Sequence, residues 1–441
     1  MEKLAELTIH NFRAIKHAEL QLSGITIVSG VNGCGKSTLS KLLYYSFRNA
    51  NAFDELAIIR LNEEIRSYIS VLEQIQFLLR YHHDTPAFGK FRSGSLTLHS
   101  LDKIDSFLSY IKELSNSFIQ LEHDGKLPVR DKERMLMILR ATFKKEESDE
   151  NNVAKLLEHL VAKVTQKTQE AVRRSQERNY GLLRESLETV FGIDISKYVQ
   201  LKEYGDAIVG DSVTSVPLMH YIRKVAYIDT PMMIGMDETV NLSDYWREIN
   251  ELIKMPPKRG YKLSISRIIQ NNILKGDVTY SSDVFNTGFR YLRKDGKEFD
   301  LLECATGIKS FALLLMLLKN RFLEEDTLLI IDEPEAHLHP QWIIEYARLI
   351  VLLHKKVGVK FFIASHSTDM ISALRYLSES EKCLDAVSFY VAESADEFGS
   401  SFTFQSLGHD IEPIFASFNK SFEKLDAYVS KEVSSQKLAH N

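Results

Sequence analysis

The stretch that most limits the fold of this chain is residues 30–38, Gly-Val-Asn-Gly-Cys-Gly-Lys-Ser-Thr. It fits the pattern G-x-x-x-x-G-K-[ST] of a phosphate-binding loop. An apolar stretch at 25–28 precedes it and a helix-like stretch at 39–47 follows it, which is the strand–loop–helix context that the motif requires. Its glycines let backbone N–H groups turn inward around phosphate oxygens at a helix start. The residues predicted to bind phosphate are Gly30, Asn32, Gly33, Cys34, Gly35, Lys36, Ser37 and Thr38.

Two side chains of this loop carry specific chemistry. Lys36 adds a positive charge for the outer phosphates, and the Ser37 hydroxyl is placed to ligate Mg²⁺. The loop therefore predicts a nucleotide site with ATP and Mg²⁺ as cofactors.

Length and composition exclude several other classes of protein. With 441 residues, two or three structural units are expected. No stretch of about 18 apolar residues predicts a membrane span, and the charged start of the chain does not resemble a signal peptide. Three cysteines without zinc-type spacing argue against a disulfide scaffold and suit the reducing cytoplasm. The net charge of −5 argues against a globally basic nucleic-acid binder.

The chain is expected to divide into four parts. Residues 1–50 and 198–410 mix strands and helices, whereas 51–197 contain few prolines or glycines and read as helical. That middle part could be an arm, a dimerisation device or a packed helical domain. Residues 411–441 read as a helical tail with an apolar face. The helices predicted in the middle part are 54–81, 101–121, 131–145 and 151–190.

A second apolar strand, at 327–331, ends in the carboxylates Asp332 and Glu333. A buried strand that stops there places both side chains at the carboxyl edge of its sheet, where ligands of α/β sheets bind. Asp332 is suited to hold Mg²⁺, and Glu333 is suited to act as the general base for the attacking water. A third such strand, 359–363, leads to His366, which could bond to the γ-phosphate and position water.

Taken together, these motifs resemble the ABC-type ATPases, in the branch shared by SMC, RecF and OLD proteins. The resemblance covers about 1–50 and 220–380, and its most specific part is the run 332–342, Asp-Glu-Pro-Glu-Ala-His-Leu-His-Pro-Gln-Trp. It implies an α/β fold: an ABC-type head, with a mixed P-loop sheet and flanking helices, interrupted by a large helical insertion. It also implies that His366 is the switch histidine and that Arg13, in the run Asn-Phe-Arg, approaches the nucleotide. His339 stands where transporters carry an aspartate.

The same resemblance implies a signature loop that meets the ATP of an opposite subunit. The candidate precedes the apolar helix 311–318 and departs from the family pattern, because alanine stands where a serine is usual. Helix-start N–H groups still favour an anion, so ATP-driven dimerisation survives this change better than fast hydrolysis does. Slow conversion of ATP and water to ADP and phosphate is expected. The residues predicted to contact this second ATP are Ala305, Thr306, Gly307 and Lys309.

By resemblance, the chain is similar to ATPase subunits of bacterial anti-phage systems, above all the Septu ATPases (PtuA, including retron-associated members), which work with an HNH nuclease. This implies a head-to-head homodimer or higher oligomer that controls a separate nuclease effector, with the tail as a docking element. A PARIS-type ATPase (AriA) that holds a Toprim effector is one alternative.

The other alternative is a RecF- or SMC-like repair ATPase that clamps DNA. Its support is a basic helix face that could follow phosphates, although such a face is often only solvated. The residues of that face are Lys163, Lys167, Arg173, Arg174, Arg178 and Arg184.

Overall fold

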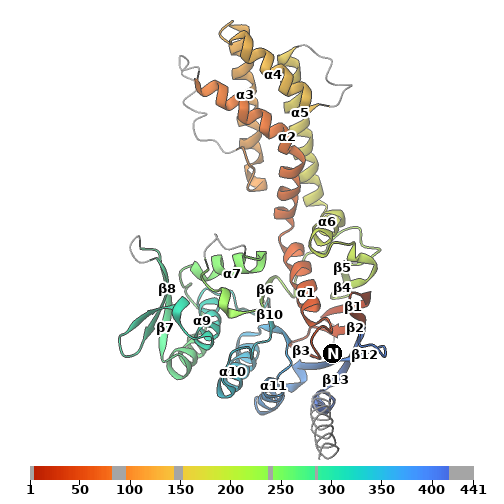
Figure 1. Cartoon of the computed structure of the whole chain (residues 1–441), viewed down its shortest axis with the longest axis vertical. Helices are drawn as coiled ribbons and strands as arrows, with labels where there is room; N and C mark the ends of the chain where they lie inside the picture. The colour runs from red at the N-terminus through yellow and green to blue at the C-terminus, as the bar shows by residue number, and fades with distance from the viewer. Residues whose placement is uncertain (1–3, 82–95, 144–151, 237–241, 284–286, 417–441) are drawn as a thin grey trace, which may run out of the picture. The chain divides into compact units, whose positions relative to one another are not determined.

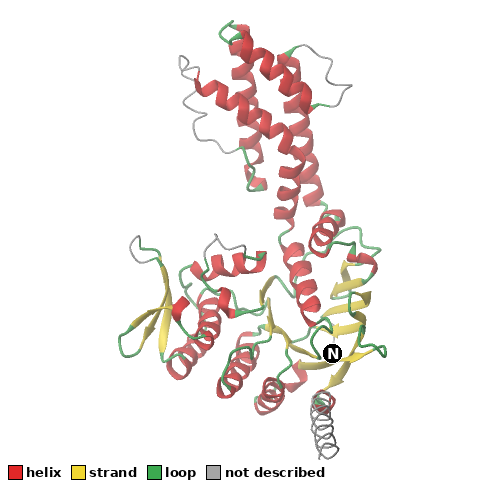
Figure 2. Cartoon of the chain, in the orientation of Figure 1, coloured by secondary structure: helices red, strands yellow, loops and turns green. Residues whose placement is uncertain are grey.

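The computed structural model describes residues 4–81, 96–143, 152–236, 242–283 and 287–416 (Figure 1). The chain forms two compact units. The head unit comprises residues 1–51, 191–213 and 217–441, and the helical unit comprises 52–190 and 214–216. Figure 2 shows that the head mixes strands and helices, while the other unit is built from helices. The predicted α/β fold, a P-loop sheet with flanking helices and a helical insertion, is confirmed.

The head is organised around a sheet of ten described strands in the order β5-β4-β1-β2-β13-β12-β3-β11-β10-β6. Neighbours from β12 through β3, β11 and β10 to β6 run parallel, so their carboxyl ends meet at one edge. The strands β3, β10 and β11 are buried at every position, as expected for parallel strands covered on both faces. The bounds are β1 (Ala5–Phe12), β2 (Ile15–Gln21), β3 (Ile25–Ser29), β4 (Val199–Glu203), β5 (Asp206–Val209), β6 (Lys224–Ile228), β10 (Thr327–Asp332), β11 (Lys360–Ala364), β12 (Val387–Ser394) and β13 (Phe402–Gly408).

Helices cover this sheet. The first, α1, packs on β6, β10 and β11, and α10 and α11 lie side by side (Figure 1). Local sequence sets the ends of α10: His339 caps its start ahead of Pro340, and Gly358 ends it with a positive φ of 90°. The head helices are α1 (Lys36–Asn51), α7 (Asp244–Lys254), α8 (Leu263–Ile268), α9 (Thr306–Lys319), α10 (Pro340–Val357) and α11 (Thr368–Ser380).

A small antiparallel sheet precedes α9. Its strands are β7 (Gly276–Ser281), β8 (Gly288–Arg293) and β9 (Glu298–Asp300). The β8–β9 hairpin turns at Asp295-Gly296, where Gly296 has a φ of 83° that suits glycine.

Among the described helices, none combines the length and the apolar character that a membrane span requires.

The helical unit has its own core, because the apolar stripes of α2, α3, α4 and α5 face one another. Leu72, Ile111, Met135 and Leu157 are completely buried in it. A packed helical unit is therefore observed, one of the three possibilities left open above. Its helices are α2 (Phe53–Tyr81), α3 (Ile104–His123), α4 (Val129–Thr142), α5 (Val153–Gln176) and α6 (Tyr180–Phe191).

The prediction of one helix over 151–190 is wrong. The chain breaks between α5 and α6, where Arg178 adopts a left-handed φ of 47°. The break is fixed by Asn179, whose side chain accepts a bond from Gly181 N at 2.8 Å. Asparagine bonds its neighbouring backbone in this way at turns, which competes with helix formation.

Candidate functional site

The phosphate loop joins β3 to α1, as its sequence predicts. Gly33 and Gly35 have φ values of 83° and 104°, which side-chain-bearing residues rarely adopt. A Cβ at Gly35 would lie 2.7 Å from the Ile15 side chain, whereas a Cβ at Gly33 would meet nothing within 4 Å. The loop is thus packed against the protein at one glycine and open to a ligand at the other.

Lys36 lies along the loop. Its Nζ donates to Gly30 O at 2.8 Å and Val31 O at 3.1 Å, and it lies 4.0 Å from Cys34 Sγ. Burial raises the pKa of the Cys34 thiol, although the nearby Lys36 charge opposes this shift. Both side chains are buried, whereas Ser37 is exposed beside them and Thr38 N bonds to Gly35 O at 3.0 Å. The exposed residues of the loop are Val31, Asn32, Gly33 and Ser37.

Asp332 is a buried carboxylate at the end of β10. Ser40 Oγ donates to its Oδ1 and Tyr227 OH donates to its Oδ2 at 2.8 Å, and the Ser37 hydroxyl lies near enough to lower its pKa. Burial raises the pKa of Asp332; these hydroxyls oppose the shift, and the nearby Asp229 charge adds to it. A buried carboxylate of this kind gains when a cation approaches.

Glu333 and His366 meet at the same sheet edge. Glu333 has a left-handed φ of 49°, a strained backbone held by its N–H bond to Ala364 O at 2.8 Å. Its side chain is 45% exposed, and its Oε1 lies 3.4 Å from His366 Nδ1. The strain turns the carboxylate out of the strand toward the histidine that follows β11. An exposed carboxylate beside an exposed imidazole can accept and relay a proton.

These residues fit the groups that the loop predicts. Hydroxyl and carboxylate oxygens from Ser37 and Asp332 are the hard donors that Mg²⁺ prefers. Loop N–H groups at the start of α1 suit phosphate oxygens, and the Lys36 amine balances their charge. The Mg²⁺–ATP site stays a prediction that this arrangement supports.

The predicted signature loop forms the start of α9. Ala305 is the residue before the helix and makes no side-chain cap bond, while its carbonyl accepts from Ile308 N and Lys309 N. Helix geometry leaves the N–H groups of Thr306 and Gly307 without intrahelical acceptors. Gly307 and Lys309 are buried, and Gly307 packs on Trp342 of α10. Because alanine stands at residue 305, where the family usually has serine, the start of α9 has no side-chain cap.

Arg13 packs against aromatic side chains of the head. It follows β1 with a left-handed φ of 53°, and its Nη2 donates to Phe191 O at 3.3 Å. Its guanidinium carbon lies 5.4 Å from the ring centroids of both Phe12 and Phe191. These contacts hold Arg13 on the head, and its approach to a nucleotide stays a prediction.

Sequence reasoning missed three residues of this edge: Ser40, Tyr227 and Glu335. Ser40 lies one turn after Lys36, and Tyr227 lies in β6, a strand that the sequence assigned to the core. Glu335 accepts from Ser365 Oγ at 2.9 Å and from His366 N at 3.1 Å. Its position two residues after Glu333 was the available signal.

Asp229 follows β6 at this edge. Both of its oxygens accept bonds at 2.6 Å, Oδ1 from Trp246 Nε1 and Oδ2 from Tyr245 OH. Because these donors occupy the carboxylate, Asp229 acts as a fixed charge near Asp332.

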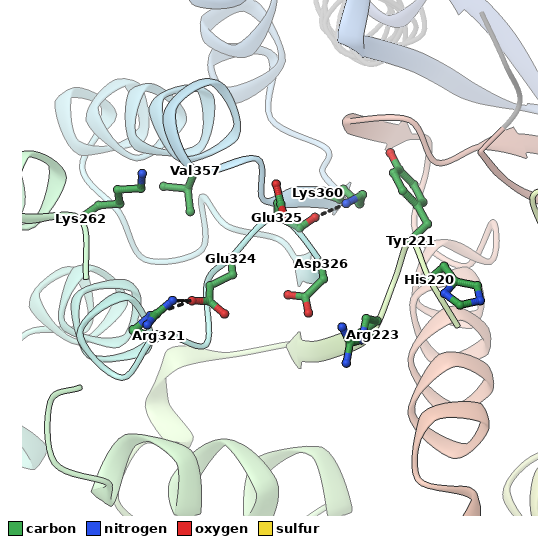
Figure 3. Close-up of a pocket in the computed structure, with 10 residues that line it drawn as sticks. All are labelled: His220, Tyr221, Arg223, Lys262, Arg321, Glu324, Glu325, Asp326, Val357 and Lys360. Atoms are coloured by element: carbon green, nitrogen blue, oxygen red, sulfur yellow. Dashed lines mark hydrogen bonds and ion pairs between the residues drawn. The ribbon is translucent and has the colours of Figure 1, made fainter. Parts of the chain in front are cut away.

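A cavity of about 600 Å³ lies at the opposite edge, beside the amino ends of β6, β10 and β11 (Figure 3). Some of its charges are paired. Lys224 beside the cavity bonds Glu324 at 2.6 Å, and Arg321 bonds the same carboxylate at 2.7 Å. Lys360 donates to Glu325 O and lies 3.9 Å from the Tyr221 ring. This cavity lies at the edge away from the phosphate loop, and Arg321 and Lys360 of its lining already have partners.

A family model described as "AAA domain, putative AbiEii toxin, Type IV TA system" matches residues 99–372, more than half of the chain. A second model, "AAA ATPase domain", matches residues 3–183. No curated protein matches the chain.

Among solved structures, the chain is similar to the SMC head domain from Thermotoga maritima, with 9% identity, 92% of this chain and 99% of that chain covered, and a TM-score of 0.37. It is similar to an SMC head bound to the C-winged helix domain of ScpA, with 10% identity, 91% and 96% covered, and a TM-score of 0.37. An SMC head with an extended coiled coil from Pyrococcus furiosus, bound to the C-terminal domain of ScpA, gives 11% identity, 97% and 100% covered, and a TM-score of 0.33.

The predicted ATPase class is confirmed at the level of the family. Because the first model spans most of the chain, from the helical unit through Asp332, Glu333 and His366, the chain belongs to the AAA domain family described as putative AbiEii toxin of a type IV TA system.

Proposed function

We propose that this chain binds ATP with Mg²⁺ and hydrolyses it slowly, as a regulatory subunit that controls a separate effector. The observation that carries the ATPase part is the convergence of three elements at one sheet edge. The phosphate loop follows β3, Asp332 ends β10, and His366 follows β11. Ligands of open α/β sheets bind at the carboxyl edge of the strands.

Each residue has a role in this proposal. Loop N–H groups and Lys36 hold the phosphates, while Ser37 and Asp332 hold the cation. When bound, Mg²⁺ would neutralise charge on the phosphate oxygens. Glu333 takes a proton from the attacking water, and His366, 3.4 Å from it, orients that water or the terminal phosphate.

We further propose a head-to-head dimer in which the start of α9 completes the site of the opposite subunit. The N–H groups of Thr306 and Gly307 point out of the first turn of a 14-residue helix, which favours an anion. The uncapped Ala305 supplies no hydroxyl, which supports slow turnover. ATP binding would then shift the equilibrium between separate and joined heads.

The effector is proposed from resemblance. The run 332–342 is similar to Septu-type defence ATPases, so we propose a separate HNH-type nuclease as the partner. The family description, which names a putative AbiEii toxin of a type IV TA system, is compatible with such a pairing. The predicted docking helix, 411–441, lies mostly outside the described residues. Unchanged co-purification of the neighbouring gene's product after deletion of 411–441 would exclude the tail as its docking element.

The DNA-clamp alternative loses support from the helical unit. Lys167 and Arg174 of the basic face bond to Glu64 at 3.1 Å, and Arg174 also bonds Glu170 at 2.7 Å. Arg178 donates to Val216 O at 2.8 Å. Charges held in such pairs release fewer counterions from a phosphate backbone.

The decisive experiment measures ATP binding and hydrolysis by the full chain and by Lys36→Ala. We expect the parent to bind ATP and Lys36→Ala to lose binding. Binding of ATP to Lys36→Ala with the parent's affinity would refute the assignment of the site.

A further inference from the structure

Glu335 is a buried carboxylate that the ATPase chemistry above does not use. It is 8% exposed and lies in the turn after Glu333. Its Oε1 accepts two bonds from the segment after β11, from Ser365 Oγ at 2.9 Å and from His366 N at 3.1 Å. Its Oε2 is buried and has no hydrogen-bond partner among the described residues. A buried polar atom without a partner is costly and is found where function requires it.

The same carboxylate faces the ring of His366. The Nδ1 atom lies 3.6 Å from Glu335 Oε1 and 3.4 Å from Glu333 Oε1. Two carboxylate oxygens on one side repel a nitrogen lone pair and attract an N–H. The proton of a neutral His366 ring therefore belongs on Nδ1, which leaves Nε2 for the reacting groups.

We propose that Glu335 is a positioning residue that fixes the orientation and the tautomer of His366. This inference rests on the proposed ATPase function of the site. With Nδ1–H fixed, a neutral ring presents an Nε2 lone pair that accepts a bond from the attacking water. A protonated ring instead donates from Nε2 to a phosphate oxygen. Glu333 is exposed and is free to turn to the water, so the constant partner of His366 is Glu335.

A purely structural role for Glu335 would be to anchor the backbone after β11. The variant Glu335→Gln separates the two roles. A glutamine oxygen still accepts from Ser365 and His366 N, so the anchor remains. Its amide carries no negative charge, so the preference for Nδ1–H is weakened. Glu335→Ala removes both the anchor and the charge. The matched control is Glu379→Gln, because Glu379 is an exposed glutamate on α11 that is paired with Arg375.

The first measurement uses full-length protein labelled with ¹⁵N-histidine and free of nucleotide. The ring nitrogens of His366 are identified by their loss in His366→Gln, and their shifts give the tautomer at each pH. We expect Nδ1–H in the parent and in Glu379→Gln, and a changed tautomer or titration in Glu335→Gln and Glu335→Ala. Nε2–H in the parent, or identical His366 shifts in parent and Glu335→Gln, would overturn the proposal.

The second measurement follows ATPase activity against pH. We expect kcat of Glu335→Gln to fall about 10-fold to 100-fold, as for other residues that orient a functional histidine, with KM within about twofold of the parent. The pH profile should shift in Glu335→Gln and stay unchanged in Glu379→Gln. If kcat and the pH profile of Glu335→Gln equalled those of the parent, the proposed role of Glu335 would also be overturned. If the parent binds no ATP, the proposed function fails, whereas the tautomer measurement still decides the role of Glu335.

Discussion

Gly307 lies against the indole of Trp342, so closely that a Cβ at residue 307 would come 2.7 Å from Trp342 Cε3. Gly307 belongs to the first turn of α9 and Trp342 to the first turn of α10. Phe311, one turn further along α9, stacks edge-on to the same indole with centroids 5.3 Å apart. The start of α9 is thereby fixed to the helix that follows the Glu333 turn.

Gly307→Ala should disturb this contact. The indole cannot yield without moving Phe311, so we expect destabilisation of about 1–3 kcal/mol, the usual cost of overpacking a core. We also expect weaker ATP-dependent dimerisation, because α9 would shift. Thermal unfolding measures the loss of stability, and size-exclusion chromatography with and without ATP measures the loss of dimerisation.

Gly210→Ala is the control, because a Cβ there meets its nearest atom at 3.5 Å, an ordinary contact. The double variant Gly307→Ala with Trp342→Leu should recover part of the lost stability, since it removes the obstacle. If Gly307→Ala were as stable as the parent and dimerised equally well, the Trp342 side chain would be shown to move aside without cost.

Glu333→Gln should separate binding from turnover. The amide cannot take a proton from water, so we expect hydrolysis to fall by about 10²-fold or more while ATP binding stays. Equilibrium binding and phosphate release measure the two properties. An ATPase rate equal to that of the parent would remove Glu333 from the mechanism.

Asp332→Asn should stabilise the nucleotide-free protein at pH 8. Burial raises the pKa of Asp332 in the fold, so the folded state holds this proton more tightly than the unfolded state. That contribution is present below the unfolded pKa and is lost as pH rises through the folded one. The uncharged amide avoids the loss, and we expect a gain of about 1 kcal/mol at pH 8 that shrinks in acid.

Thermal unfolding against pH tests this, with the exposed Asp211→Asn as the control. Added Mg²⁺ and ATP should stabilise the parent and have less effect on Asp332→Asn. A lower melting temperature for Asp332→Asn at pH 8 without ligand would contradict the prediction.

Glu64 should make α2 and α5 sensitive to acid. Burial alone would raise the pKa of Glu64, but bonds and charges from Lys167 and Arg174 outweigh it and lower the pKa. A lowered pKa gives stability above the unfolded value of about 4.3, lost as pH falls through the folded one. Hydrogen exchange in α2 and α5 should be faster in Glu64→Gln at pH 7. The free energy of opening should fall by about 1 kcal/mol or less, because the paired side chains are partly exposed to solvent.

That difference should shrink as pH falls below the unfolded value and close once pH has passed the lowered pKa of Glu64, where the parent carboxylate is also protonated. Glu63→Gln, whose side chain is 65% exposed, is the control. Equal exchange in parent and Glu64→Gln at pH 7 would show that the ion pairs contribute nothing.

The sequence predicted the fold where local pattern and tertiary contact agree. The strands 25–28 and 327–331 are largely apolar, and each is followed by residues with distinct chemistry. It failed at Arg178, because an apolar stripe continues on both sides of a turn that depends on Ser215 pairing with Asn179. It missed Glu335 because burial against His366 depends on β10 and β11 being neighbours, which the spacing of residues in the chain does not state.

The order of strands also dictates when this protein can become active during synthesis. β3 carries the phosphate loop, and its neighbours are β11 and β12: Ile25 pairs with Phe361 on one side and Val387 on the other. The phosphate loop is translated early, whereas β11 and β12, which flank β3, are translated much later. Such distant pairings are slow to form, so an unfinished chain presents an unpaired β3 and needs protection until the sheet closes around it.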